Sequence, residues 1–224
     1  SLIGLTLTGG QRGVYAKFGA GLNNGILALD QCIVSNNASH GFFHDNGSSW
    51  NGVTIRNGLI VGNGGDGVKV DQDWTTPFYN FIVNTTIANN GGSGYLGGNY
   101  YQRSTYIVNC IIAFNGEYGI RRWNRSFQSA TTVDYTASTC LYGNPAGNIS
   151  SAWHPFPWQR TLRGVFSADP LFVGNGDYRL LDGSPCVDAT VANGLPVPAV
   201  TVDLDNADRT GVYDLGCHES AWSA

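Results

Sequence analysis

The amino-acid sequence predicts an all-β chain: a right-handed parallel β-helix of about six coils with an irregular C-terminal closure. Two observations lead to this fold class. The motif Asn-x-x-x-Gly-apolar returns four times at near-constant spacing, and each copy follows a pair of β-forming residues. No stretch of useful length shows the period of about 3.6 residues that marks an amphipathic helix. A repeat of roughly 20–50 residues is typical of solenoids, in which each unit buries its apolar face against its neighbours.

The repeated asparagine and glycine are expected to mark one corner of each coil. The asparagine recurs about every 26 residues, and the glycine lies four residues after it. These residues are Asn37, Asn63, Asn90 and Asn115, and Gly41, Gly67, Gly94 and Gly119. A stacked side-chain amide can donate to and accept from its equivalents, which predicts an internal asparagine ladder, while glycine permits close backbone approach. The simpler alternative is that the asparagines mark surface turns.

The segments between these motifs are predicted to be short strands. Each unit is rich in Val, Ile, Thr, Phe and Tyr and is interrupted by Asn-Gly, Asn-Asn and Gly-Gly pairs, which mark turns. A unit of this length accommodates two or three short strands, as one coil of a parallel β-helix requires. We therefore expect coils over residues 1–150, and a C-terminal excursion and closure segment over residues 151–224 that packs on the helix.

Composition argues against two classes of partner. The chain has 224 residues, of which 12% are charged, with a net charge of −4 and two lysines, Lys17 and Lys69. A nucleic-acid partner would require a basic stripe, which so few cations do not supply. No apolar run reaches the ~18 residues of a membrane span. The absence of Met indicates a chain that has been processed, trimmed or expressed as a fragment.

Five short stretches in the C-terminal part give a more specific signal. They are 169–173 (DPLFV), 176–180 (GDYRL), 183–188 (GSPCVD), 202–205 (VDLD) and 214–219 (DLGCHE). In this order they resemble the C-terminal closure of the right-handed parallel β-helix repeat proteins of the pectin-lyase-like superfamily. With the coils, the resemblance implies this fold over nearly the whole chain. It implies little about activity, because many such proteins are extracellular or surface proteins of unassigned role.

The resemblance also draws attention to two cysteines. A small residue such as Ala stands in that family where Cys186 and Cys217 stand here. Cysteines in both closure motifs suggest a disulfide that ties down the final segment, and two independent buried thiols are the alternative. A disulfide would place the protein in an oxidising, extracellular setting. Cys32 and Cys110 share a repeat column at a separation too large for a disulfide, and we expect them to be buried thiols.

The first coil is predicted to be uncovered. The coil pattern starts at Leu2, whereas β-helices of the resembled family usually begin with a cap. An uncovered strand edge over an apolar core pairs with whatever fits it. Either the natural chain is longer or another subunit supplies the cap, and repetition of such a contact between copies would give a filament.

The outward-facing residues of one strand per coil are the strongest candidates for chemistry. Alternation along the strand places Lys69 and Arg121 in one outward column and Asp45, Asp71 and Trp123 in the next. β-Helix polysaccharide lyases use a basic residue to abstract a proton α to a uronate, and their acidic residues often bind calcium. Lys69, Asp71 and Arg121 are therefore the candidate catalytic residues, and Asp45 is a candidate ligand-binding residue. Ordinary solubilising ion pairs, worth ~0–1 kcal/mol, are the alternative.

Aromatic residues in or near turns form a second candidate site. Trp74, Tyr101 and Trp123 are the residues in question. Their rings are suited to stacking on sugars or to packing between subunits. Local packing within the turns is the alternative.

An acidic run near the C-terminus is the candidate metal site. Asp203, Asp205 and Asp208 supply oxygen ligands of the kind that calcium prefers, and calcium is the one cofactor considered. Their spacing is not that of a 12-residue calcium loop. Turn formation and pairing with Arg209 are the alternative.

Two hypotheses about function follow. The first is an extracellular structural β-helix module that self-associates, end to end into a filament or as a surface layer, with copies of itself as partner. The second is a polysaccharide lyase or hydrolase, or a carbohydrate-binding module without catalysis, with a polysaccharide as partner. The sequence leaves open whether the chain is an enzyme.

Overall fold

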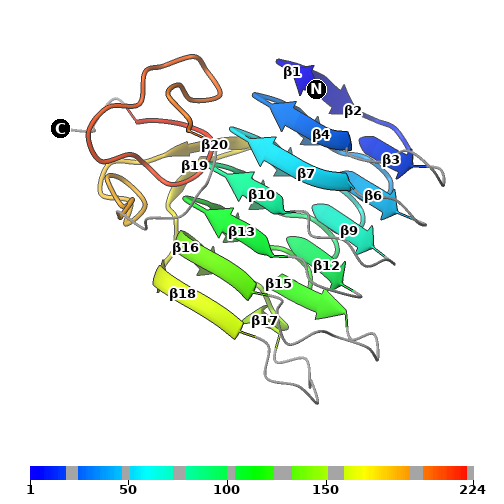
Figure 1. Ribbon diagram of the computed structural model, residues 1–224. Helices are drawn as coiled ribbons and strands as arrows, with labels where there is room; N and C mark the ends of the chain where they lie inside the picture. The colour runs from blue at the N-terminus through cyan, green and yellow to red at the C-terminus, as the bar shows by residue number, and fades with distance from the viewer. Residues whose placement is uncertain are drawn as a thin grey trace.

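The chain winds into a solenoid with three faces, and in each face parallel strands from successive coils stack on one another. The computed structural model describes residues 1–18, 25–46, 51–72, 79–99, 104–123, 133–150, 159–191 and 199–220. These ranges contain twenty strands and no helix. Within them there is accordingly no helix that is long and apolar enough to cross a membrane. Strands β1 to β18 stack as the rungs of a parallel β-helix, and β19 and β20 form an antiparallel hairpin (Figure 1). The all-β parallel solenoid predicted from the repeat is confirmed.

Each face takes every third strand of the chain. Face 1 contains β1 (Leu2–Ile3), β4 (Gly25–Asp30), β7 (Asn51–Arg56), β10 (Asn80–Val83), β13 (Thr105–Val108), β16 (Val133–Tyr142) and β18 (Gln159–Phe166). Face 2 contains β2 (Thr6–Thr8), β5 (Ile33–Ser35), β8 (Leu59–Val61), β11 (Thr86–Ala88), β14 (Ile111–Ala113) and the end of β16. Face 3 contains β3 (Val14–Phe18), β6 (Phe42–Asn46), β9 (Val68–Gln72), β12 (Tyr95–Asn99), β15 (Tyr118–Trp123) and β17 (Gly147–Ile149). The hairpin pairs β19 (Phe172–Gly174) with β20 (Asp177–Leu180).

The solenoid has about four complete turns, with a less regular rung at each end. The complete turns are those that carry the four copies of the asparagine motif, from β4 through β15. In the first rung β1 has only two residues, and in the last rung the long β16 spans both face 1 and face 2. The six coils predicted from the sequence therefore include two rungs that are not full turns.

Branched aliphatic side chains fill the interior in aligned columns. On face 2, Val34, Ile60, Ile87, Ile112 and Leu141 follow one another in register from coil to coil, and each is at most 1% exposed. In-register parallel pairing makes this alignment inevitable, because equivalent positions of successive coils point the same way. β-Branched residues pack well on such a pleated surface, which explains their abundance in the repeat.

The asparagine ladder is present at the corner between face 2 and face 3. The Nδ2 of Asn37 donates to the Oδ1 of Asn63 at 2.8 Å, and the same bond links Asn63 to Asn90 and Asn90 to Asn115, each at 2.9 Å. Asn115 continues the ladder to Asn144 at 3.1 Å. The same Nδ2 groups also donate to backbone carbonyls, and all five residues are buried. Stacking thus satisfies polar groups that the corner removes from water.

The glycine of each motif allows the coils to approach at this corner. A Cβ built on Gly67 would lie 2.5 Å from Ile87 Cγ2, 2.8 Å from the carbonyl oxygen of Gly94 and 2.9 Å from Asn90 Nδ2. Gly41 and Gly94 face equivalent atoms at similar distances. These glycines do not have positive φ, so close approach of side chains and backbone is the reason for glycine here.

Two further columns hold residues with left-handed backbone, one at the corner between face 1 and face 2 and one beside the asparagine ladder. Between face 1 and face 2, Asn57, Asn84 and Asn109 have φ of 48°, 46° and 57°. Between face 2 and the asparagine ladder, Asn36 and Asn89 do the same, with φ of 54° and 55°. Asparagine tolerates this conformation better than most residues, so its frequency in the sequence has two separate causes.

Residues 167–191 and 199–220 close the structure by packing on the outer side of face 2. Outward residues of face 2, among them Leu59 and Ile111, are buried against Cys217, Leu215 and Leu180 of this closure. Backbone contacts reinforce the packing, since Gly216 donates to the carbonyl of Asn109 at 2.9 Å. Face 2 is therefore covered on both sides, which explains why its strands read as continuous apolar runs.

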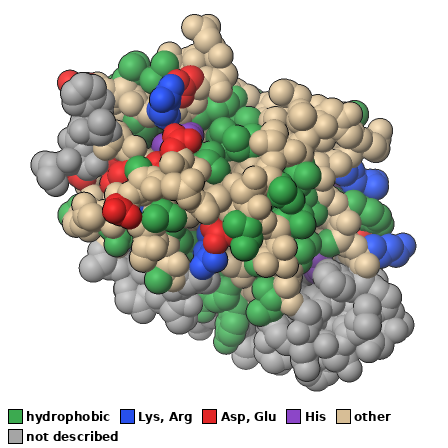
Figure 2. Space-filling view, turned by 90° about the horizontal axis from the view of Figure 1, so that it is seen from above, with side chains coloured by type: hydrophobic (Ala, Val, Ile, Leu, Met, Phe, Trp, Pro, Cys, Tyr) green, Lys and Arg blue, Asp and Glu red, His purple; other side chains and the backbone are tan. Residues whose placement is uncertain are grey.

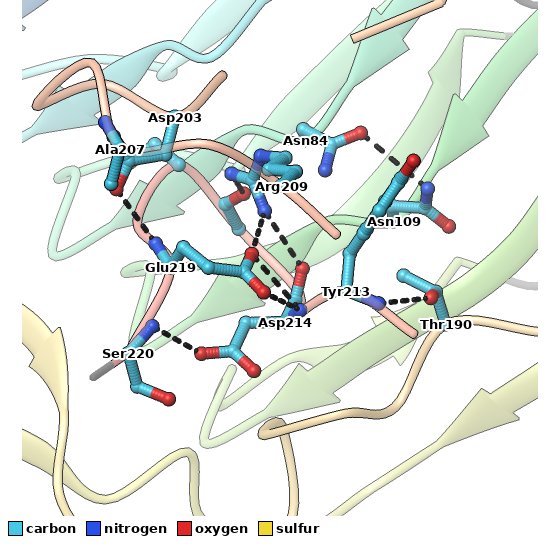
Figure 3. A network of polar contacts seen from close by, with 12 residues as sticks. Asn84, Asn109, Thr190, Asp203, Ala207, Arg209, Tyr213, Asp214, Glu219 and Ser220 are labelled. Atoms are coloured by element: carbon cyan, nitrogen blue, oxygen red, sulfur yellow. Dashed lines mark hydrogen bonds and ion pairs between the residues drawn. The ribbon is translucent and has the colours of Figure 1, made fainter. Parts of the chain in front are cut away.

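A buried arginine organises the end of the closure. Arg209 has a fully buried side chain that pairs with Glu219 at 2.7 Å and donates to the carbonyls of Asp214 and Gly216 at 3.2 Å and 2.9 Å (Figure 3). Asp214 in turn accepts from the backbone N–H of Ser220. These contacts hold the last described residues together over face 2.

The disulfide suggested between Cys186 and Cys217 is not formed. All five cysteines are free and buried. Cys217 lies in an apolar cluster with Leu59 and Ala88, whereas Cys186 lies in a different cluster with Cys140. The two closure motifs that carry the cysteines thus pack over different coils, a separation that the sequence spacing does not reveal.

Candidate functional site

Face 3 presents two outward columns of side chains that run along the helix axis. The register aligns Tyr15 with Phe43, Phe43 with Lys69, Lys69 with Leu96, and Leu96 with Arg121. The columns follow from alternation along each strand and from the absence of register shifts between these coils. The sequence therefore predicts the order of Phe43, Lys69, Leu96 and Arg121 correctly.

Cations and aromatic rings interleave at the start of the first column. Arg12 lies over the rings of Tyr15 and Phe43 at 4.7 Å and 5.2 Å from their centroids, and the ammonium of Lys69 lies 4.8 Å from the centroid of Phe43. The two rings are themselves 5.5 Å apart. We call Arg12, Tyr15, Phe43 and Lys69 the cation–aromatic cluster. Each cation over a ring contributes on the order of 0.5–1 kcal/mol at an exposed site. These contacts hold the four side chains in a defined arrangement before any ligand binds.

The second outward column is acidic. In the backbone register Lys17 is aligned with Asp45, and Asp45 with Asp71, on successive rungs ~4.8 Å apart. Tyr15 donates its hydroxyl to Asp45 Oδ2 at 2.6 Å, and Lys17 Nζ lies 3.9 Å from the same oxygen. The hydrogen bond to Asp45 raises the pKa of Tyr15, which keeps the phenol protonated at neutral pH. A raised pKa makes the Tyr15 phenol a weaker acid, and its hydroxyl hydrogen is already donated to Asp45, so Tyr15 is a neutral group fixed in place on this face.

Arg121 belongs to a different neighbourhood from Lys69. Its guanidinium pairs with Glu117 at 2.5 Å, and the buried Leu96 occupies the rung between Arg121 and Lys69. The next residue, Arg122, points into the interior and pairs there with Asp134. The backbone register thus places Lys69 and Asp71 on the same strand with Asp45 on the preceding rung, and Arg121 two rungs from Lys69.

A polar chain along the adjoining turn was not predicted from the sequence. The backbone N–H of Asp66 donates to Nδ1 of His40 at 3.0 Å, and Asp66 Oδ1 accepts from the N–H of Ser93 at 2.8 Å. Ser93 Oγ donates to Glu117 at 3.2 Å. Serine, histidine and aspartate are the residue types of a catalytic triad. Here, however, Asp66 lies between Ser93 and His40, and the Ser93 hydroxyl donates to Glu117. The chain therefore supports the turns and is not placed for acyl transfer.

Three of the predicted ligand-binding residues lie beyond structural description. Trp74 and Tyr101 fall outside the described residues. The backbone of Trp123 pairs with Gly98, as the register predicts, and its side chain is outside the described part.

The predicted calcium ligands are arranged differently from the expectation. Asp203 and Asp205 lie close to His218, with ligand atoms within 4.8 Å of one another, while Asp208 is exposed and is not part of this group. Asp203 Oδ1 accepts from the N–H groups of Asp205 and Ala207, both at 2.8 Å. Burial disfavours the charged ring of His218, but Cys217, Asp205 and Asp203 outweigh it and raise the pKa to about 9. In this arrangement Nδ1 of His218 lies 3.1 Å from Asp205 Oδ2, so the three side chains form an ion-paired group.

Strand pairing and the asparagine ladder thus define the chain as a parallel β-helix protein. Neither the models of protein families nor the curated proteins contain a match to it. Among solved structures it is similar to the crystal structure of the periplasmic alginate epimerase AlgG, with a TM-score of 0.48 and 18% sequence identity over 74% of this chain. The match covers 40% of that protein's chain, and a similarity this distant concerns the fold alone.

Proposed function

We propose that the chain is a carbohydrate-binding β-helix whose face 3 holds an acidic polysaccharide extended along the helix axis. The cation–aromatic cluster is the observation that carries the proposal. It spans three successive rungs, so its cations are spaced along the helix axis. The carboxylates of a polyuronate are likewise spaced along its chain, so a chain that lies parallel to the axis can bring them to these cations. Arginine and lysine bind carboxylates through charge-assisted hydrogen bonds, and the rings supply apolar contact for sugar faces.

Binding is supported better than catalysis. A lyase needs a base beside the proton that it removes, and Tyr15 is held protonated by Asp45. The ammonium of Lys69 lies 4.8 Å from the centroid of the Phe43 ring, a position suited to binding an anion at the surface. Catalysis by Lys69, Asp71 and Arg121 is the alternative, and the distance of Arg121 from the other two weakens it.

Affinity measurements on matched variants test the proposal. We expect polygalacturonate or alginate to bind more tightly than a neutral glucan, with affinity that falls as salt is raised. Lys69→Ala should weaken binding about tenfold, since a charge-assisted bond is worth ~1.5 kcal/mol. Arg179→Ala is the matched control, because Arg179 is an exposed cation on the closure. Equal binding of neutral glucan, or unchanged affinity in Lys69→Ala, would refute the proposal, and release of unsaturated sugars would favour the lyase.

Self-association through the first rung is the second candidate. Strands β1, β2 and β3 have a hydrogen-bonded neighbour on one side only, and Ile3 and Leu5 beside them are 61% and 42% exposed. Apolar side chains are visible on this end of the molecule, while basic side chains project at the right edge of the view (Figure 2). A second copy could add strands to this edge. Light scattering on the same samples tests it: a dimer or filament that Ile3→Lys dissociates supports the idea, and a monomer at all concentrations excludes it.

A further inference from the structure

Cys140 and Cys186 lie against each other where the closure meets the last rung. Cys140 is in the second half of β16, in register with Ile111 of the preceding coil. Both thiols are fully buried in one apolar cluster, which also contains Leu180 and Leu215. Each thiol is the chief influence on the pKa of the other, which requires the two sulfur atoms to lie close together. The contact therefore joins residues from the solenoid and from the closure.

Independent contacts hold each member of the pair. Cys140 Sγ is 3.1 Å from the carbonyl oxygen of Ala168, and the Cys186 N–H donates to Ser184 Oγ at 3.1 Å. Ser184 Oγ donates to the carbonyl of Pro170 at 2.7 Å, and the carbonyl of Cys186 accepts from Leu215 at 2.9 Å. The closure backbone is thus fixed on both sides of Cys186. The position of the Cys186 sulfur beside Cys140 is therefore determined by contacts other than those of the two thiols.

The other described thiols differ from this pair. Cys110 donates to the carbonyls of Ile82 and Val108 at 3.4 Å and 3.2 Å, and burial raises the pKa of Cys110 to about 12. In the pair, the contact between the two side chains lowers the pKa of Cys140 and raises that of Cys186. These opposite shifts show that the two sulfurs interact in the folded chain; before the closure packs, either cysteine can supply the thiolate that begins thiol–disulfide exchange.

We propose that Cys140 and Cys186 are an oxidation site, which forms a disulfide between the last rung and the closure as the chain folds in the presence of a low-molecular-weight disulfide such as oxidised glutathione. Where Cys140 supplies the first thiolate, that thiolate attacks one sulfur of the oxidant and releases one glutathione thiolate. The Cys186 sulfur, after loss of its proton, then attacks the Cys140 sulfur of the mixed disulfide and releases the second glutathione. Two protein thiols are oxidised and one glutathione disulfide is reduced to two thiols.

The site is accessible to the oxidant only before the closure packs. Both side chains are 0% exposed in the folded chain, so a molecule the size of glutathione cannot reach them there. The bond that results closes a loop of about 45 residues, and the lost loop entropy of the unfolded chain stabilises the fold. In a chain of this size a disulfide of ordinary strength raises Tm by roughly 5–15 °C.

Peptide mapping tests the proposal on the unmodified chain. Cleavage after Lys and Arg places the five cysteines in five different peptides, with Cys140 in 126–160, Cys186 in 180–209 and Cys217 in 210–224. The protein is unfolded in reductant, refolded with a mixture of reduced and oxidised glutathione, and alkylated in denaturant before cleavage. We expect a linked pair of peptides 126–160 and 180–209. A link between 180–209 and 210–224, or five alkylated thiols, would overturn the proposal.

Thermal unfolding of two variants separates the disulfide from packing effects. Wild type unfolded and refolded in reductant should have a Tm roughly 5–15 °C below that of wild type refolded with the glutathione mixture. Cys110→Ala alters an equally buried thiol outside the pair and should keep this dependence on reductant. Cys186→Ala should have the same Tm with and without reductant. Dependence on reductant that survives in Cys186→Ala, or is absent in the wild type, contradicts the assignment.

Discussion

Each asparagine of the ladder satisfies backbone groups in its own coil and in the preceding one. Asn90 Nδ2 donates to the carbonyls of Ile60 and Ala88 at 3.1 Å and 3.2 Å and to Asn115 Oδ1 at 2.9 Å. Its Oδ1 accepts from both the backbone N–H and the Nδ2 of Asn63. No other side chain of this size offers two donors and an acceptor in one plane, which explains why the position repeats as asparagine.

Replacement of Asn90 by alanine is expected to lower the free energy of unfolding by about 3 kcal/mol or more. The substitution removes the acceptor of the Asn63 backbone N–H and the side-chain donor to the carbonyls of Ile60 and Ala88, at a cost of about 1–3 kcal/mol for each buried group left unpaired, and it opens a cavity at the corner. Urea unfolding followed by circular dichroism measures the loss. Thr8→Ala, an exposed change on β2, should stay within about 0.5 kcal/mol of wild type. A loss no larger at Asn90 than at Thr8 would mean that the ladder does not stabilise the fold.

At the scale of the strand and its corner, glycine has two different roles in this chain. At Gly67 the backbone conformation is ordinary, and the space for a Cβ is already filled by Ile87, Gly94 and Asn90. At Gly176, in the turn between β19 and β20, the space is open, but φ is +87°. The first role is steric and the second is conformational, so the two positions respond differently to the same substitution.

Gly67→Ala is expected to destabilise the fold more than Gly176→Ala. At Gly67 the new methyl group would collide with a backbone carbonyl on the next coil, which cannot move without shifting that coil, and overpacking of this kind costs roughly 1–3 kcal/mol or more. At Gly176 the cost is about 1 kcal/mol, that of a positive φ in alanine. Chemical denaturation of both variants gives the comparison. Equal or reversed losses would show that the coils can separate at this corner at little cost.

The repeat made the coils and the outward columns predictable, because an in-register parallel stack translates sequence spacing directly into position. Phe43, Lys69 and Arg121 are aligned for that reason alone. The contacts of His40 with Asp66 share the same spacing, but the residue type changes from coil to coil, so no repeated letter marks the column. The closure has no period at all, and the contact of Cys186 with Cys140 depends on which coil it covers.

On the scale of the whole molecule, the closure and the solenoid stabilise each other. Gln31 Nε2 donates to the carbonyl of Asp203 at 2.9 Å, and the N–H of Cys217 donates to Thr86 Oγ1 at 3.2 Å. The closure thus reaches back over several coils toward the first rung, and it covers the outer side of face 2 while faces 1 and 3 carry the other exposed columns (Figure 1). Candidate ligand contacts and structural contacts consequently lie on different faces, so variants on face 3 can be made without disturbing the closure.

We expect His218 to make the stability of the closure itself dependent on pH, because its partner Asp205 also lies in the closure. Its Nδ1 lies 3.1 Å from Asp205 Oδ2, and its pKa is raised from 6.5 to about 9 although burial alone would lower it. A pKa that is higher in the folded chain contributes stability that is fully present below pH 6.5 and is lost as pH rises through about 9. We expect the free energy of unfolding to fall between pH 6.5 and 9.5 by roughly 2 kcal/mol more in wild type than in His218→Gln. Thr8→Ala is the control, because it is an exposed change on β2 that alters no ionisable group. Urea midpoints at the two pH values decide the matter: the same decrease in wild type and His218→Gln would show that the ion pair with Asp205 does not hold the closure in place.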